Sequence, residues 1–378
     1  MDPSYEVRTH VQSFDRSSYS SYVLGVDIGG THTNCGIAGI LENTPQVLVS
    51  LHFKSQHLPS LLPALQTTLG YAKNTLSIDI ATGCFASAGV VSPDKMSAEL
   101  TNVSWDIALA DILGNTSLRT ATIINDFQAI GYGINLLNPS NENDLLQIKK
   151  GTTEDLKKGS YTKAIIGAGT GLGKSILVYN ATLRSYLPLP SEGGHGNFPI
   201  ISEDELQLAQ YIQKKKNLQH PVSYEDILSG GGIEHMYCYL REQERFETTR
   251  FSEEIDKSSE KAPLISRYRH DDPTCKETFR LFSLFYGRCA KNFVLDTLCE
   301  QGLYIAGGIA SKNRDIFSSK EFLSEFENAH THADILRNTP IYVITNYDVS
   351  LYGACLAAMQ EDVSGQTTKR THLWEDTT

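Results

Sequence analysis

LGVDIGGTH, residues 24–32, decides the fold class of this chain. A short apolar segment, Tyr22–Val26, predicts a strand that ends at the acidic residue Asp27, and a Gly-Gly-Thr turn follows. Glycine lets the backbone approach a ligand closely, and successive N–H groups in such a turn can hold phosphate oxygens. Asp27 can bind Mg²⁺ directly or through water, because this cation prefers carboxylate and water oxygens. The motif also fits a tight connection between strands, so it is a candidate phosphate site made by Gly29, Gly30 and Thr31.

A second glycine-rich run, GAGTGLG at residues 167–173, follows the apolar segment Ala164–Ile166. Residues 168–175 also fit a relaxed P-loop pattern, which requires a helix after the glycines. Instead, Ser175–Tyr179 is rich in β-branched and apolar residues, and a turn-like Asn-Ala-Thr comes next. We therefore predict a β-hairpin, with a second phosphate-binding turn made by Gly169, Thr170 and Gly171.

A third glycine motif, Gly307-Gly308, ends the apolar segment Gly302–Ala306. This motif fits either a third ligand-binding turn or an ordinary turn from a strand to a helix. The two Gly-Thr loops lie about 140 residues apart, which suggests one nucleotide held between two similar domains. In this respect the chain resembles the actin-like ATPase superfamily, with its ribonuclease H-like fold, which includes sugar kinases and Hsp70. The resemblance implies an α/β chain of two domains, an active site in the interdomain cleft, and Gly307-Gly308 lying against adenosine.

An Asn-Asp pair, Asn125-Asp126, follows the apolar segment Ala121–Ile124. In α/β sheets, ligands bind outside the carboxyl ends of strands. Asp126 could accept a hydroxyl proton as that oxygen attacks a phosphoryl group, while Asn125 orients the acceptor. The pair also fits a helix start, with Asp126 as the N-cap of a helix from Phe127. The two roles are compatible.

Further polar residues suited to a polyhydroxylated ligand follow in two segments. Glu192 and His195 flank two glycines and offer hydrogen-bond acceptors and a donor. A metal site is the alternative, but one Glu and one His are a poor ligand set. Glu225 precedes a run of three glycines, although Ser223 with Glu225 and Asp226 also resembles a capped first helical turn.

Over about residues 22–359 the chain resembles the ATP-dependent glucokinases of the bacterial hexokinase group. The motifs, in the order of that family, are VDIGGT, TNVSWDI, IINDFQAI, GAGTGLG, LPSEGGHGNF, LSGGG after Glu225, YIAGGI and DVSLYGA. The resemblance implies transfer of the ATP γ-phosphoryl group to the 6-hydroxyl of glucose, with Mg²⁺, with Asp126 as the general base, and in a homodimer. It assigns the sugar side of the site to Asn102, Asn125, Asp126, Glu192, His195 and Glu225.

Two positions depart from the family pattern. The family's first loop usually reads Gly-Gly-Thr-Asn with an arginine two residues later, where this chain has His32 and Asn34. This removes a bidentate phosphate contact that neither side chain replaces with a fixed charge. Lys174 stands where the family commonly has an apolar residue, and it points either at the phosphates or into solvent, depending on strand register.

Composition supports this interpretation. A chain of 378 residues is long for one core and suggests two domains. Net charge −11 argues against a nucleic-acid surface. Seven dispersed cysteines without a C-x-x-C pair predict free thiols in a reducing compartment. No apolar stretch reaches membrane-spanning length and the N-terminus lacks signal-peptide features, so we expect a cytoplasmic protein.

We expect the following organisation: a polar, mobile extension over residues 1–20; a small α/β domain over 21–135 plus about 352–363; a large α/β domain over 136–351; and a polar tail over 364–378. Within the large domain, residues 277–301 predict a helix whose aromatic stripe packs in the core. Residues 244–273 predict a solvated surface segment.

Two other functional classes fit a kinase fold. A sugar-sensing transcriptional regulator needs a DNA-binding module, but the residues before Tyr22 are too few for one and have no basic face. An actin-like ATPase scaffold leaves the polar set around Asp126 and Glu192 without a role. We therefore expect a hexose kinase.

Overall fold

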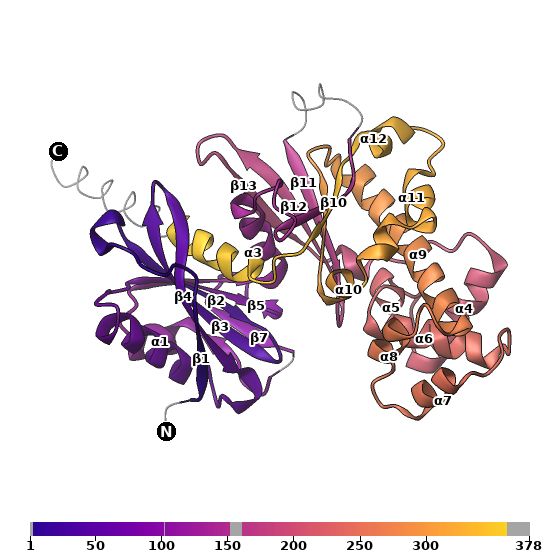
Figure 1. Ribbon diagram of the computed structural model, residues 1–378, viewed down its shortest axis with the longest axis horizontal. Coiled ribbons are helices and arrows are strands. Elements are labelled where there is room, and N and C mark those ends of the chain that lie inside the picture. The colour runs from indigo at the N-terminus through magenta and orange to yellow at the C-terminus, as the bar shows by residue number, and fades with distance from the viewer. Residues whose placement is uncertain (1–2, 102, 152–160, 361–378) are drawn as a thin grey trace. The chain divides into compact units, whose positions relative to one another are not determined.

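The chain, seen here in a computed structural model, forms two α/β units (Figure 1). The structure describes residues 3–101, 103–151 and 161–360. Unit 1 comprises residues 1–137 with 347–378, and unit 2 comprises residues 138–346. Each unit is built on a six-stranded mixed sheet. Within the described ranges, no helix is both long and apolar enough to cross a membrane.

In unit 1 an antiparallel meander continues into parallel strands, in the order β1-β4-β3-β2-β5-β9. The β3–β4 hairpin turns at Glu42 and Asn43, which both have positive φ, as a two-residue turn that matches strand twist requires. The strands are β1 (Tyr5–Thr9), β2 (Tyr22–Ile28), β3 (His32–Leu41), β4 (Thr44–Lys54), β5 (Thr82–Ser87) and β9 (Thr120–Asn125). A small separate sheet contains β6 (Gly89–Val91), β7 (Ser97–Leu100) and β8 (Ile107–Ala108).

Helices cover both faces of the unit 1 sheet. Helices α1 (Leu62–Asn74) and α2 (Leu109–Asn115) contribute to one apolar core. Helix α3 (Asp126–Gly133) and a helix over residues 349–360 contribute to the other. These last two helices approach closely, because a Cβ on Gly353 would lie only 1.7 Å from the Ala129 carbonyl oxygen.

Unit 2 repeats the meander and the three parallel strands of this plan, but its sixth strand lies beside the parallel strands instead of beside the meander. Its sheet order is β10-β15-β14-β11-β12-β13, with β11, β12 and β13 as the meander and β11, β14 and β15 parallel. No internal repeat is evident in the sequence, so the duplication is structural. The strands are β10 (Leu145–Lys149), β11 (Thr162–Ala168), β12 (Leu172–Asn180), β13 (Ser185–Ser191), β14 (Leu303–Ala306) and β15 (Ile341–Ile344).

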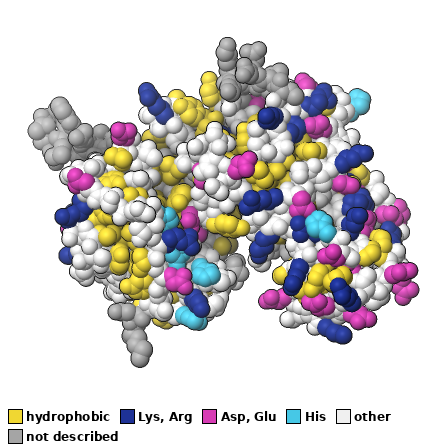
Figure 2. All heavy atoms as spheres, viewed as in Figure 1, with side chains coloured by type: hydrophobic (Ala, Val, Ile, Leu, Met, Phe, Trp, Pro, Cys, Tyr) yellow, Lys and Arg dark blue, Asp and Glu magenta, His cyan; other side chains and the backbone are white. Residues whose placement is uncertain are grey.

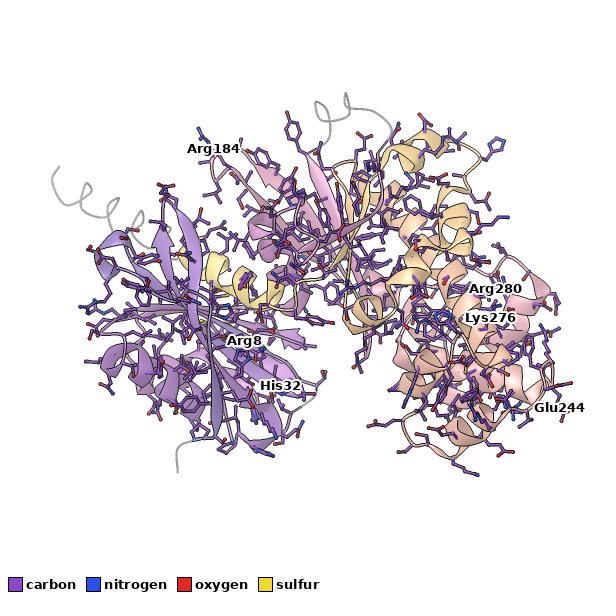
Figure 3. All side chains as sticks on the ribbon, viewed as in Figure 1. Arg8, His32, Arg184, Glu244, Lys276 and Arg280 are labelled. Carbon is purple, nitrogen blue, oxygen red and sulfur yellow. The ribbon has the colours of Figure 1, made fainter. Side chains whose placement is uncertain are left out.

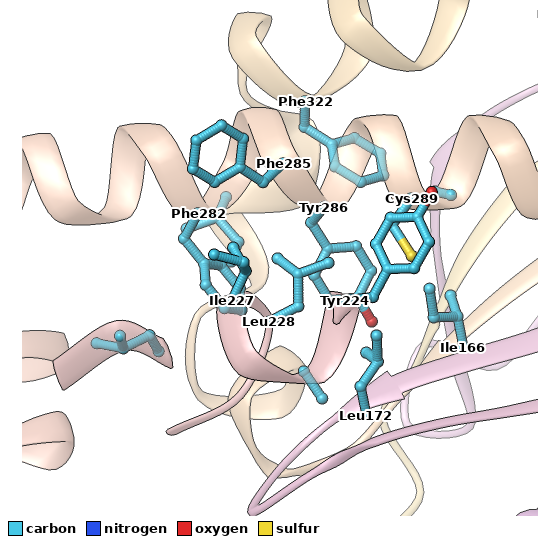
Figure 4. Close-up of a cluster of buried hydrophobic side chains, with 14 of the residues drawn as sticks. Ile166, Leu172, Tyr224, Ile227, Leu228, Phe282, Phe285, Tyr286, Cys289 and Phe322 are labelled. Carbon is cyan, nitrogen blue, oxygen red and sulfur yellow. The ribbon is translucent and has the colours of Figure 1, made fainter. Parts of the chain in front are cut away.

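The core of unit 2 is dominated by α9, Pro273–Thr297. Its aromatic side chains are buried and pack with residues from α5 and β11, as Figure 4 shows. This confirms the predicted helix and aromatic core. The other helices are α4 (Glu203–Lys216), α5 (Tyr224–Ile227), α6 (Gly230–Glu242), α7 (Arg250–Lys257), α8 (Lys261–Arg267), α10 (Gly308–Lys312), α11 (Lys320–Glu327) and α12 (Ala333–Asn338).

Two expectations are wrong. Residues 1–20 are not simply a mobile extension, because Tyr5–Thr9 pairs antiparallel with β4 as the edge strand β1. That strand gains its backbone partners from the open edge of β4. Leu298, which lies within the range 277–301 predicted to form the core helix, is 51% exposed. It caps α9 in the left-handed conformation, with φ 47°, which turns it off the buried face.

Candidate active site

In unit 1, a buried hydrogen-bond set surrounds Asp27 at the carboxyl end of β2. The Ser350 hydroxyl donates to Asp27 Oδ1 at 2.8 Å. Asn34 is its direct cross-strand partner and also hydrogen-bonds to the carboxyl group. Burial raises the pKa of Asp27, the bonds from Ser350 and Asn34 lower it, and the Asp348 charge raises it. Ser350, which comes from the helix over residues 349–360, was not among the site residues predicted from the sequence.

The first glycine turn is hydrogen-bonded to a 3-10 turn, Ser55–His57. The Ser55 hydroxyl donates to the Gly29 carbonyl at 2.7 Å, and its N–H donates to the Thr31 carbonyl at 3.0 Å. Gln56 Nε2 donates to the Gly30 carbonyl at 3.0 Å. The turn's carbonyl groups are thus occupied. Among the described residues, its Gly30 and Thr31 N–H groups have no acceptor, which leaves them available to an anion.

Asn125 and Asp126 lie where β9 passes into α3. Asn125, rather than Asp126, is the N-cap: its Oδ1 accepts from the Phe127 N–H at 2.8 Å, and Gln128 completes a capping box. Asp126 is the first helical residue. Burial raises the pKa of Asp126 to about 6, and the nearby charge of Asp27 also raises it. Hydrogen bonds from Phe127 and Asn125 lower this pKa and offset part of the rise. Asn102, expected on the sugar side, lies outside the described residues.

In unit 2, three glycine segments lie together at the carboxyl ends of β11 and β14. The β11–β12 pairing runs to Ala168 opposite Leu172, which confirms the predicted hairpin and excludes a P-loop helix. The Gly230 N–H, at the start of α6, donates to the Gly169 carbonyl at 2.9 Å. Gly307 has φ +94°, and a Cβ there would lie 2.5 Å from the Ala168 carbonyl oxygen. Gly230 was not among the site residues predicted from the sequence.

Glu225 lies against the second glycine turn. Its Oε2 accepts from the Leu172 N–H at 2.9 Å, and a Cβ on Gly171 would lie 2.5 Å from the same oxygen. A Cβ on Gly194 would lie 1.9 Å from the Leu172 carbonyl oxygen, so glycine is required for this approach. Ser223 does form the expected capping box, with Asp226 as its partner. The segment therefore caps a helix and leaves Glu225 free to face the turn.

Glu192 and His195 lie on one exposed loop at the end of β13. His195 Nε2 is 3.7 Å from Glu192 Oε2, and both side chains are largely exposed. The Tyr224 N–H donates to the Gly196 carbonyl at 2.9 Å, which ties this loop to the segment that carries Glu225. Unit 2 therefore gathers Glu192, His195 and Glu225 beside its glycine turn.

Lys174 adopts neither of the two orientations considered from the sequence. Its side chain is buried, with Nζ 4.6 Å from the ring centre of Tyr224 and 5.0 Å from that of Phe293. Its Cδ would lie 3.0 Å from a Cβ on Gly193. The lysine is thus a packing element beneath the Glu192–His195 loop, where cation–π contacts stabilise its charge.

The residues fit Mg²⁺ only as a hydrated ion. Within the described ranges, no three His, Cys, Asp or Glu residues are placed to hold a metal. Asn34 Oδ1, across the strand pair from Asp27, is a buried acceptor without a partner in that part of the chain. The Asp27 carboxylate and the nearby unpaired Asn34 oxygen suit a cation that keeps several waters and binds substrate phosphates.

Two mixed sheets that share a meander and three parallel strands, each with a glycine turn beside carboxylates, are the fold of the actin-like class of ATP-dependent sugar kinases. Solved structures share this fold. Glucokinase from an Antarctic psychrotroph has a TM-score of 0.73 and 24% identity, covering 90% of this chain and 99% of its own. Glucokinase from Balamuthia mandrillaris, in complex with glucose, has a TM-score of 0.72 and 22% identity, covering 89% of this chain and 93% of its own.

Sequence comparison identifies the family. The Glucokinase family model matches residues 24–361. The glucokinase of Nostoc sp. is 33% identical over 351 residues, which cover 89% of this chain and 98% of the relative. The chain belongs to the glucokinase family, and it is an ATP:D-glucose 6-phosphotransferase.

Proposed function

We propose that Asp126 is the general base that accepts the proton from the glucose 6-hydroxyl as its oxygen attacks the γ-phosphorus of ATP. The observation that carries this assignment is a carboxyl group at a strand end whose pKa burial raises to about 6. Such a group is ionised at neutral pH and still basic enough to take a proton. Asn125 lies beside it with its oxygen committed to the helix cap, so its amide group acts as a donor.

The family resemblance assigns glucose binding to five residues besides Asp126. Asn102 and Asn125 of unit 1, and Glu192, His195 and Glu225 of unit 2, pair with the sugar hydroxyls. Glu225 already accepts one backbone N–H, so its second carboxylate oxygen is the one offered to a hydroxyl. The spacing of Glu192 and His195 supports a shared hydroxyl, because a group that both donates and accepts can bond to each.

ATP is held by the two glycine turns, Gly29–Thr31 and Gly169–Gly171. Backbone N–H groups bind the phosphate oxygens, and Gly307-Gly308 lies against the adenosine. Asp27 would hold the Mg²⁺ of MgATP through water, and the ion would neutralise charge on the phosphates. The buried Asn34 Oδ1 across the strand pair supports this role, since it offers a second oxygen to the hydrated ion.

We also infer that the enzyme acts in the cytoplasm as a homodimer. The seven cysteines are all free and six of them are buried, as expected in a reducing compartment. The dimer rests on the family resemblance alone.

Replacing Asp126 tests the base. Asp126→Asn should keep the helix start and lower kcat by about 10²–10⁴-fold, because a positioned base contributes that much. Asp111→Asn, an exposed carboxylate on α2 of the same unit, is the matched control and should leave kcat unchanged. Near-normal kcat in a folded Asp126→Asn protein would exclude Asp126 as the base.

A further inference from the structure

Beside the first glycine turn, unit 1 has a cavity of about 310 Å³ that the proposed mechanism does not use. Its lining includes Glu6 of β1, His32 of β3, His52 and Lys54 of β4, and His57 of the 3-10 turn. On the surface of unit 1 seen in Figure 2, histidine side chains gather with basic and acidic ones, and Figure 3 labels His32. A volume of this size suits a small ligand.

Strand register places these side chains on one face of the sheet. His32 is directly opposite Lys54, and Glu6 is directly opposite His52. Opposed residues of an antiparallel pair point to the same side, as do residues two apart on one strand. The regular strand pairing therefore brings imidazole, ammonium and carboxylate groups together in the cavity.

Most of these polar groups are unpartnered. In the described part of the chain, Lys54 makes no ion pair, and the imidazoles of His32 and His57 make no hydrogen bond. His52 differs: its Nε2 hydrogen-bonds with the Ser50 hydroxyl at 2.8 Å, and burial lowers its pKa. The lining thus offers one fixed positive charge and two free imidazoles to a ligand.

The cavity is physically joined to the glycine turn. Lys54 and His57 flank Ser55 and Gln56, the two residues whose hydrogen bonds hold the turn's carbonyl groups. A group bound in the cavity therefore lies next to the turn. A chelated metal is not the favoured occupant, because no three potential ligands among the described residues are close enough.

We propose that this cavity binds a phosphate group, with Lys54 as its fixed cation and with His32 and His57 as N–H donors. Ammonium and imidazole donors suit phosphate oxygens, and charge-assisted bonds to them are strong. Glu6 accepts a hydrogen bond from a hydroxyl on or beside the phosphate. The phosphate comes either from the polyphosphate tail of the nucleotide or from a separate phosphate compound. The assignment does not depend on Asp126 being the base.

Binding of inorganic phosphate to the full-length protein tests the proposal. Isothermal titration at pH 7 and low salt should show saturable binding, and Lys54→Met should weaken it by about tenfold or more, as for loss of a charge-assisted bond. His57→Gln should weaken it as well. Lys73→Met, an exposed lysine of α1 in the same unit, should leave it unchanged. The Asp126→Asn protein should bind phosphate like the wild type, which separates this proposal from the catalytic one.

Steady-state kinetics distinguish the two sources. If the site takes nucleotide phosphates, inorganic phosphate competes with ATP and Lys54→Met raises the KM for ATP without changing that for glucose. If it takes a separate compound, phosphate changes the rate without competing with ATP, and Lys54→Met removes only that effect. Equal phosphate affinity in wild type and Lys54→Met, or no saturable binding in the wild type, would overturn the proposal.

Discussion

Asp126→Asn should make the protein more stable at neutral pH. The folded state raises the pKa of Asp126 from 3.8 to about 6. A shift of that size corresponds to about 3 kcal/mol of unfavourable folding free energy for the ionised form. That shift is already the net of the burial that disfavours the charge and of the helix N-terminus and hydrogen bonds that favour it. The gain on substitution is therefore up to about 3 kcal/mol, and we expect about 2 kcal/mol.

The sign of the pH dependence follows from linkage. Between pH 3.8 and about 6 the folded state binds more protons at Asp126 than the unfolded state does. Stability from this group therefore falls as pH rises through that window. The advantage of Asp126→Asn should be absent below pH 3.8 and complete above pH 6.

Urea unfolding followed by tryptophan fluorescence measures this effect in unit 1. Trp105 is buried in its core, and a Trp374→Phe background leaves it as the sole tryptophan. A gain of about 2 kcal/mol moves the midpoint upward by roughly 1 M urea for a typical slope. Asp111→Asn should move it little at any pH. A midpoint that is lowered by Asp126→Asn at pH 7, or raised equally at pH 7 and pH 3.5, would refute the reasoning.

Two further predictions concern a buried charge and the metal. Arg288 is buried and bonds to Glu205 at 2.8 Å and to Glu325 at 3.0 Å. Arg288→Met should cost about 3–5 kcal/mol, because it leaves Glu205 without its ion-pair partner and Glu325 with Lys291 alone. The midpoint of urea unfolding measures this loss of stability. Arg280→Met, at a more exposed arginine, is the control and should cost about 1 kcal/mol or less. Equal losses of stability in the two variants would contradict the prediction. Removing Mg²⁺ with EDTA should abolish glucose phosphorylation, and Asp27→Asn should raise the Mg²⁺ concentration needed for half-maximal rate. Full activity in EDTA would exclude the metal.

Much of the fold could be predicted because local patterns were strong. The β-branched run after Gly173 predicted a hairpin rather than a P-loop helix, and β12 confirms it. The helical spacing of aromatic residues predicted α9. The edge strand β1 was missed because five residues carry little pattern, and its pairing depends on the open edge of β4.

The site was predicted in its residue types but not in their partners. The motifs identified Asp27, yet its hydroxyl partner Ser350 is 323 residues away. Likewise, the burial of Lys174 between two aromatic rings depends on α5 and α9, which no local pattern around the lysine reveals.

By itself, the sequence determined the glycine turns, the strand-end carboxylates and the amphipathic core helix, since these arise from conformational preferences and periodicities over a few residues. The tertiary structure alone decided that Glu225 faces the Leu172 N–H and that Asp126 has a raised pKa. These properties depend on which distant segments pack together, so the residues next to them in the sequence do not predict them.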